Sequence, residues 1–326
     1  MGNALVDVLV RVEKDSILQE LRLPKGSMQL VDDARLQEIE KRIDGFERVL
    51  VSGGSAANTI HGLAELGIST GFIGSAGMDP WGEFYINDLK RRGVKPVFYR
   101  SENPTGRAMA FLTPDSERTF GTYLGAAIEL RPEFLSPELF YGWNIFHIEG
   151  YLVQNHDLIE SALKLARLAG CLISLDLASY NVVEENLEFL KSIIPQYVDI
   201  LFSNQEEAFA FTGMEPDRAV EELASFCRIA IIKTGKDGAW VQSGAEKYHV
   251  NGLEANCIDT TGAGDLFASG FLYGYTRGYS LTKCGELGNF LAAAVIEVTG
   301  PKISEPHWLK IRQTLAIIKT TEPGNI

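Results

Sequence analysis

Hydrophobic and polar positions follow two patterns that take turns along the chain. Short runs rich in β-branched residues have the length of buried strands, and segments with apolar residues every three or four positions have the periodicity of helices. Residues 157–169 are such a helical segment, which Gly170 ends. The clearest strand candidates are residues 49–52, 144–148, 172–176, 199–203 and 229–233. This alternation predicts an α/β fold with a doubly wound, mostly parallel sheet flanked by helices.

Two regions depart from this rhythm. Residues 5–30 and 95–124 hold short strand-like runs separated by Pro and Gly, with no intervening helix. They predict a small β-rich lid that projects from the core. Because no repeat, low-complexity tract or linker divides the sequence, we expect a single domain over residues 1–326.

Composition narrows the classes of function. The 43 acidic residues exceed the 30 basic ones, and the formal charge of −13 opposes binding to a nucleic acid. The four cysteines form no C-x-x-C pair, so neither a zinc site nor a disulfide framework is indicated, and a cytoplasmic location fits best. No apolar run approaches the ~20 residues that cross a bilayer, so we expect no membrane partner.

The residues that point to a chemistry lie in the segment 259–265, which reads D-T-T-G-A-G-D. Apolar residues recur at helical spacing after it, so a Gly-rich turn opens a helix. Backbone amides of small residues at a helix N-terminus bind anions. We therefore interpret Asp265 as the base that accepts a proton from an alcohol, while the amides of Gly262, Ala263 and Gly264 hold the transferring phosphoryl group. The alternative for this segment alone is an ordinary turn with Asp265 as a helix cap.

The longer string D-T-T-G-A-G-D-L-F-A-S-G-F-L resembles the second signature of the PfkB, or ribokinase-like, carbohydrate kinases. The string S-G-G-S-A-A-N-T at residues 52–59 resembles the first signature, and the likeness covers nearly the whole chain. This likeness is strongest to the adenosine kinase-like branch of the family. The resemblance implies a ribokinase-like fold and ATP-dependent transfer of the γ-phosphoryl group to a hydroxymethyl group of a nucleoside, by in-line attack with Asp265 as base.

The same resemblance implies the residues that bind the acceptor. Gly53 and Gly54 match the family's diglycine hinge, and Asn58 matches the residue that binds the acceptor's hydroxyl groups. Asn3 and Asp7 match early polar residues that bind the sugar. A Gly-Gly pair between a strand and a helix is also common as a purely structural turn.

For ATP and Mg²⁺, the resemblance points to two further segments. Asn204 and Glu207 match an N-x-x-E motif whose Glu organises magnesium, usually through water, although acidic residues at a helix start are also ordinary dipole complements. Thr234 and Gly235 match part of the family's T-x-G nucleotide segment. Asn289 lies where relatives place a residue against the adenine.

A monovalent cation is a further implication of the resemblance. Asp259, Thr261 and Gly300 lie in the segments where many relatives bind K⁺. In some relatives the lid also forms an interface between subunits, and a homodimer through the lid is the corresponding expectation.

Several other functions lack their motifs. The sequence has no P-loop string, no H-R-D or D-F-G of a protein kinase, and no G-x-G-x-x-G of a nicotinamide dehydrogenase after its first strand. Two alternatives stay open. One is a noncatalytic metabolite-binding homologue, against which the intact 262–265 segment argues. The other is a kinase of ribose or fructose, because Met28 lies near where adenosine kinases have a Gln that contacts the nucleoside.

Overall fold

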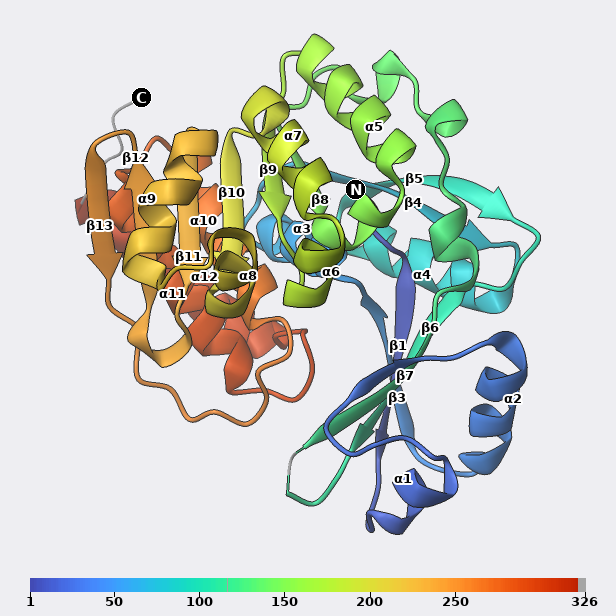
Figure 1. The fold of residues 1–326 in the computed structure, drawn as a ribbon. Coiled ribbons are helices and arrows are strands. Elements are labelled where there is room, and N and C mark those ends of the chain that lie inside the picture. The colour runs from blue at the N-terminus through green and yellow to red at the C-terminus, as the bar shows by residue number, and fades with distance from the viewer. Residues whose placement is uncertain (116, 322–326) are drawn as a thin grey trace. The chain divides into compact units, whose positions relative to one another are not determined.

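The structure is a computed structural model that describes residues 1–115 and 117–321, drawn in Figure 1. By its internal contacts the chain divides into two compact units. The large unit comprises Met1–Gly2, Gly62–Ser69 and the chain from Arg131 onward, and the small unit comprises Asn3–His61 and Thr70–Leu130.

A six-stranded sheet in the order β13-β12-β11-β10-β9-β8 forms the centre of the large unit's described residues. The strands from β8 to β11 are parallel, and the last two are antiparallel to their neighbours. Their side chains are mostly buried, as expected for apolar parallel strands covered on both faces. These strands are β8 (Ile145–Glu149), β9 (Leu172–Asp176), β10 (Ile200–Asn204), β11 (Ile229–Lys233), β12 (Ala239–Ser243) and β13 (Glu246–Val250).

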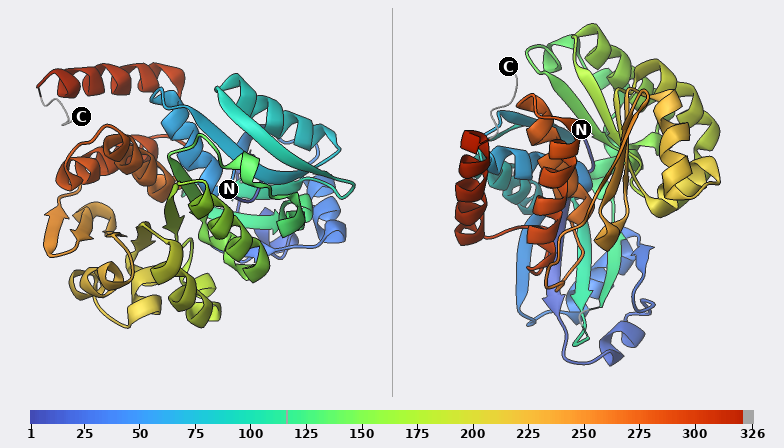
Figure 2. Two further views of the ribbon diagram at one scale, coloured as in Figure 1. Left: turned by 90° about the horizontal axis from the view of Figure 1, so that it is seen from above. Right: turned by 90° about the vertical axis from the view of Figure 1, so that its left-hand side faces the viewer.

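Helices cover both faces of this sheet, as the right-hand view of Figure 2 shows. Strands β8 to β11 are added in one direction, so right-handed crossovers place the connecting helices on the same face. These are α5 (His156–Leu168), α6 (Tyr180–Glu185), α7 (Leu187–Tyr197), α8 (Gln205–Thr212) and α9 (Pro216–Phe226).

The opposite face is covered by α10 (Ala263–Thr276) and α11 (Leu281–Ile296). Phe271 and Phe267 of α10 pack edge-on against Phe202 of β10, with ring centroids 5.4 and 6.5 Å apart. The remaining helical segments of the large unit are η2 (Pro132–Phe134), η3 (Pro137–Leu139), η4 (Gly150–Gln154), η5 (Gly235–Asp237) and α12 (Glu305–Thr321). This arrangement confirms the predicted α/β fold and the four strand predictions beyond residue 140.

The small unit contains, within its described residues, a five-stranded sheet in the order β2-β7-β6-β1-β3. Val6, Val8 and Val10 of β1 are buried and alternate with half-exposed residues, because one face of the sheet is covered by α1 and α2 (Figure 1). The elements are β1 (Leu5–Arg11), α1 (Ser16–Glu20), β2 (Met28–Leu30), α2 (Asp33–Arg42), β3 (Arg48–Gly53), β6 (Gly106–Leu112) and β7 (Arg118–Tyr123).

A second, two-stranded sheet completes the small unit. Its strands β4 and β5 are parallel, and the rings of Phe72, Tyr85 and Phe98 pack together between them and α4. The elements are α3 (Ser55–Glu65), whose residues from Gly62 belong to the large unit, β4 (Thr70–Gly77), α4 (Pro80–Arg91), β5 (Val94–Ser101) and η1 (Gly125–Glu129).

Two local predictions were wrong. The strand expected at residues 49–52 is β3, which pairs with β1 in the small unit instead of joining the other predicted strands. Its half-exposed pattern suits a sheet covered on one face, a distinction that a four-residue run does not display. Residues 5–30 also include the helix α1, whose five residues are too few for a periodic signal.

None of the helices in the described ranges is long and apolar enough to cross a membrane.

Candidate active site

Polar side chains stand at the carboxyl ends of the parallel strands β8 to β11: Glu149, Asp176, Asn204 and Lys233. Glu149 is opposite Asp176 in the sheet register, and Asn204 is opposite Lys233. In open α/β sheets, ligands bind at this edge because the carboxyl ends of several strands converge there. The large unit therefore presents a charged cluster where its fold class places a site.

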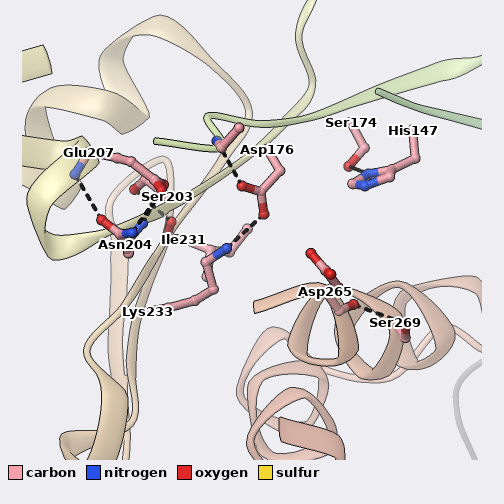
Figure 3. A network of polar contacts seen from close by, with 11 residues as sticks. His147, Ser174, Asp176, Ser203, Asn204, Glu207, Ile231, Lys233, Asp265 and Ser269 are labelled. Atoms are coloured by element: carbon pink, nitrogen blue, oxygen red, sulfur yellow. Dashed lines mark hydrogen bonds and ion pairs between the residues drawn. The ribbon is translucent and has the colours of Figure 1, made fainter. Parts of the chain in front are cut away.

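An ion pair joins two of these strand ends. The ammonium of Lys233 donates to Oδ2 of Asp176 at 2.7 Å, reaching across β10, and the amide of Ala178 donates to the other carboxylate oxygen at 3.1 Å. The side chains of Lys233 and Asp176 are only 14% and 7% exposed. Figure 3 shows this contact, together with the Asp265 carboxylate, which extends from the first turn of α10 toward the same side.

The Gly-rich turn before α10 opens a helix, as the sequence predicts, and within it the amide of Ala263 donates to the carbonyl of Thr260 at 3.1 Å. Gly262 is the helix N-cap with φ of 79°, a conformation that favours glycine, and an added Cβ there would lie 2.8 Å from Cβ of Pro301. Asp265 is the third residue of α10. A Cβ on Gly264 would lie 3.1 Å from the Lys233 nitrogen, so the ammonium lies directly against this turn.

Asn204 and Glu207 form a capping box at the start of α8. The amide of Glu207 donates to the Asn204 side chain at 2.8 Å, and the Glu207 carboxylate accepts from the backbone and side-chain nitrogens of Asn204 at 2.8 and 2.7 Å. Burial, reinforced by the charge of Asp176, raises the pKa of Glu207 to about 7, although Lys233 acts in the opposite direction. The motif is thus at once a helix cap and part of the charged cluster.

Lys233 keeps its charge in this environment. Burial alone would lower its pKa, but the carboxylates of Asp176, Glu207 and Asp265 together hold that pKa above its ordinary value. Nearby, burial and then the surrounding negative charges raise the pKa of Tyr151 to about 12. The phenol is neutral and the ammonium is positive at physiological pH.

The candidate nucleotide-binding residues differ in whether their polar side-chain atoms form hydrogen bonds within the protein. The hydroxyl of Thr234 is buried and has no hydrogen-bond partner among the described residues, and Gly235 follows with φ of 61°. Asn289 donates from its side-chain nitrogen to the carbonyls of Val250 and Asn251, at 3.3 and 2.9 Å. The Thr234 hydroxyl is thus buried without a partner among the described residues, whereas the Asn289 side-chain nitrogen orders the chain after β13.

The residues matched to a monovalent-cation site lie together. The Asp259 carboxylate accepts the amide of Thr261 at 3.0 Å and the amide of Gly300 at 2.5 Å. Within the described residues, no cluster of three or more His, Cys, Asp or Glu is arranged to hold a metal ion.

The acceptor-binding candidates gather within the small unit. An added Cβ on Gly53 would lie 2.2 Å from Oδ1 of Asp7, and one on Gly54 would lie 2.3 Å from the carbonyl of Asn3. Asn58 follows on the first turn of α3, and its backbone amide donates to the carbonyl of Gly54 at 2.9 Å. The two glycines leave the space that Asp7 and the Asn3 backbone occupy.

Sequence reasoning did not place Asp176 and Lys233 in the charged cluster that the structure shows. It placed each at the end of a predicted strand and assigned neither to the site. The available signal was that both charged residues end apolar, buried strands on the sheet edge where ligands bind in α/β folds. That signal requires knowing that β9 and β11 flank β10, which the strand order establishes.

Known proteins resemble the chain over most of its length. The sequence model of the family described as "pfkB family carbohydrate kinase" matches residues 28–308. The structure of adenosine kinase from Sinorhizobium meliloti is 36% identical, with a TM-score of 0.86, and the match covers 96% of this chain and 97% of that one. A probable sugar kinase from Rhizobium etli CFN 42 is 34% identical, with a TM-score of 0.86 and 96% of each chain covered. Adenosine kinase of Saccharomyces cerevisiae is 28% identical over 326 residues, covering 92% of this chain and 95% of the yeast protein.

Proposed function

This chain belongs to the pfkB family of carbohydrate kinases, and we propose that this ATP-dependent kinase phosphorylates a hydroxymethyl group of an adenosine-like nucleoside. The observation that carries the choice of acceptor is the 36% identity to the adenosine kinase of Sinorhizobium meliloti over 96% of the chain. The match covers 96% of the chain, so it extends over both units.

The first turn of α10 supplies the groups for the transfer. Asp265 accepts the proton of the acceptor hydroxyl as its oxygen attacks the γ-phosphorus in line. The amides of Gly262 and Gly264 at the helix N-terminus stabilise the charge on the transferring phosphoryl group, whereas the amide of Ala263 donates to the carbonyl of Thr260 at 3.1 Å. The base and the anion site lie within four consecutive residues, so their geometry is fixed by one helical turn.

ATP fits the residues of the large unit. The buried hydroxyl of Thr234 can donate to a phosphate oxygen, and the amides around Gly264 bind anions. Asn289 retains its side-chain oxygen as an acceptor for an adenine amine, since only its nitrogen is used by Val250 and Asn251.

Mg²⁺ fits this region as an ion held mainly by phosphates and water. Both oxygens of Glu207 already accept N–H groups from Asn204, so a contact through water suits this carboxylate better than direct ligation. The ion neutralises phosphate charge when it is bound. The requirement for K⁺ near Asp259 stays a prediction, to be tested by the dependence of turnover on KCl against NaCl.

The acceptor is recognised, in this proposal, by Asn3, Asp7 and Asn58, with the backbone of Gly53 and Gly54 in contact with it. A sugar kinase is the second candidate, favoured by Met28. This residue lies at the sheet edge on β2, is 52% exposed and offers no hydrogen bond to a base.

The test is an assay of ADP release across adenosine, other nucleosides, ribose and fructose, with MgATP as donor. We expect kcat/KM to be highest for adenosine. A higher value for ribose or fructose would replace the nucleoside assignment with the second candidate. Turnover of none of these acceptors would overturn the nucleoside proposal.

A further inference from the structure

We propose that Lys233 is a further catalytic residue of this site: its ammonium binds the phosphate oxygens held at the Gly262–Gly264 turn, and Asp176 positions it there. This inference deepens the proposed function and rests on it for the identity of the donor, ATP. It assigns to two residues, at the ends of the strands that flank β10, a role that their sequence context alone did not indicate.

Geometry is the first support. Lys233 ends β11, yet its nitrogen lies against Gly264, at the start of the helix that carries Asp265. A Cβ on Gly264 would lie 3.1 Å from that nitrogen, so the absence of a side chain at this position leaves the ammonium next to the turn's backbone amides. An anion bound by those amides therefore comes within reach of a formal positive charge.

Unused donors are the second support. An ammonium has three N–H donors, and among the described residues the hydrogen bond of Lys233 goes to Oδ2 of Asp176 alone. Asp176 is itself held by the amide of Ala178, and its side chain is 7% exposed, so it is a fixed anchor. Asp176 thus orients the ammonium while leaving donors for a ligand.

Charge is the third support. Asp176, Glu207 and Asp265 all act electrostatically on Lys233, so the site is rich in carboxylates. Bringing a polyanion among them is unfavourable unless a cation is already present. Lys233 is that cation. Because it is buried, its electrostatic attraction to an anion is stronger than it would be in water.

In the reaction, the ammonium keeps its proton throughout. The bond between the acceptor oxygen and the γ-phosphorus forms as the bond from that phosphorus to the β,γ-bridging oxygen breaks. The leaving ADP takes the electron pair, and the acceptor's proton goes to Asp265. Lys233 offsets negative charge on the phosphate oxygens during this exchange.

The competing explanation is a purely structural ion pair, because removing one partner of a buried pair destabilises a protein even where no ligand is involved. The experiment therefore compares Lys233→Met with the double variant Lys233→Met/Asp176→Asn, in which the carboxylate that paired with Lys233 is no longer left charged. Lys247→Met is the matched control. Lys247 also pairs with a carboxylate, that of Glu221 at 2.8 Å, on β13 of the same unit.

The measurement is the affinity of each full-length variant for MgATP and for ADP by calorimetry without acceptor, with folding checked by thermal unfolding. We expect both Lys233 variants to bind MgATP roughly 10- to 100-fold more weakly, the usual worth of a charged hydrogen bond, and to bind ADP, which lacks the γ-phosphoryl group, normally. Lys247→Met should bind both nucleotides as the wild type does. If Lys233→Met fails to fold, the double variant decides.

Recovery of wild-type affinity for MgATP in the double variant would overturn the inference in favour of a structural pair. Equal loss of affinity for ADP and MgATP in both variants would overturn it as well. These readouts need no acceptor, so an error in the acceptor assignment leaves them interpretable. An absence of adenosine turnover by the wild type would instead count against the proposed function.

Discussion

In the large unit, the candidate residues carry charge and hold one another by ion pairs and charge-assisted hydrogen bonds. Lys233, Asp176 and Glu207 are three such residues from three different strand ends or helix starts. In the small unit, the candidate residues are positioned by close steric packing. Gly53 and Gly54 are adjacent positions where a single added carbon would collide with Asp7 or with the backbone of Asn3.

This difference indicates how each region depends on its residues. The large unit's cluster depends on charge, so a substitution that conserves shape and removes charge should be severe there. The small unit's cluster depends on space, so one added methyl group should be severe. The predictions below test this contrast, in order of decreasing expected effect.

The largest effect is expected from Asp265→Asn, which preserves shape and removes the proton acceptor. We expect kcat to fall by roughly 10² to 10⁴, the usual contribution of a positioned base, with a normal thermal unfolding midpoint. Steady-state kinetics with the best acceptor measures this fall. Asp157→Asn is the control, since Asp157 is also an acidic residue in the first turn of a helix, α5. Near-normal turnover by Asp265→Asn would refute the role of base.

A smaller effect is expected from Gly53→Ala. The new Cβ would lie 2.2 Å from Oδ1 of Asp7, so the Asp7 side chain must move. Overpacking of this kind costs about 1–3 kcal/mol, so we expect kcat/KM for the acceptor to fall roughly 5- to 100-fold while KM for MgATP changes little.

Gly121→Ala is the control for this change. It adds a Cβ in the same sheet, 3.0 Å from the flexible end of Ile39, and none of the acceptor candidates borders it. If Gly53→Ala raised KM for MgATP as much as KM for the acceptor, the assignment of the small unit's cluster to the acceptor would be wrong.

The smallest effect concerns the pH dependence of stability. Burial raises the pKa of Glu207 from its ordinary 4.5 to about 7. A carboxyl whose folded-state pKa is raised gives stability that is fully present below pH 4.5 and is lost as pH rises through about 7. We therefore expect Glu207→Gln to lose less stability than the wild type between pH 5 and pH 8.

This difference should be on the order of 1–3 kcal/mol, measured by chemical denaturation at several pH values in EDTA. The control is Glu206→Gln, which changes the neighbouring glutamate in the same first turn of α8. Parallel pH profiles for the wild type and Glu207→Gln would show that Glu207 is not the buried acid described above.

The sequence by itself determined the elements whose physical cause is local. The turn at residues 262–264 needs small residues and a positive φ, and the helix after it needs apolar residues at helical spacing, so both can be read from consecutive positions. Strands β8 to β11 are short, mostly apolar runs, which identify buried parallel strands without knowledge of their partners.

Only the tertiary structure decided which distant residues meet. Lys233 pairs with a carboxylate 57 positions away because β9 and β11 flank β10, and the order of strands in a sheet is not encoded in any single strand. The same holds for β3, which has the composition of a core strand and pairs with β1 in the small unit. The raised pKa of Glu207 and the space that Gly53 leaves for Asp7 likewise depend on neighbours that only folding supplies.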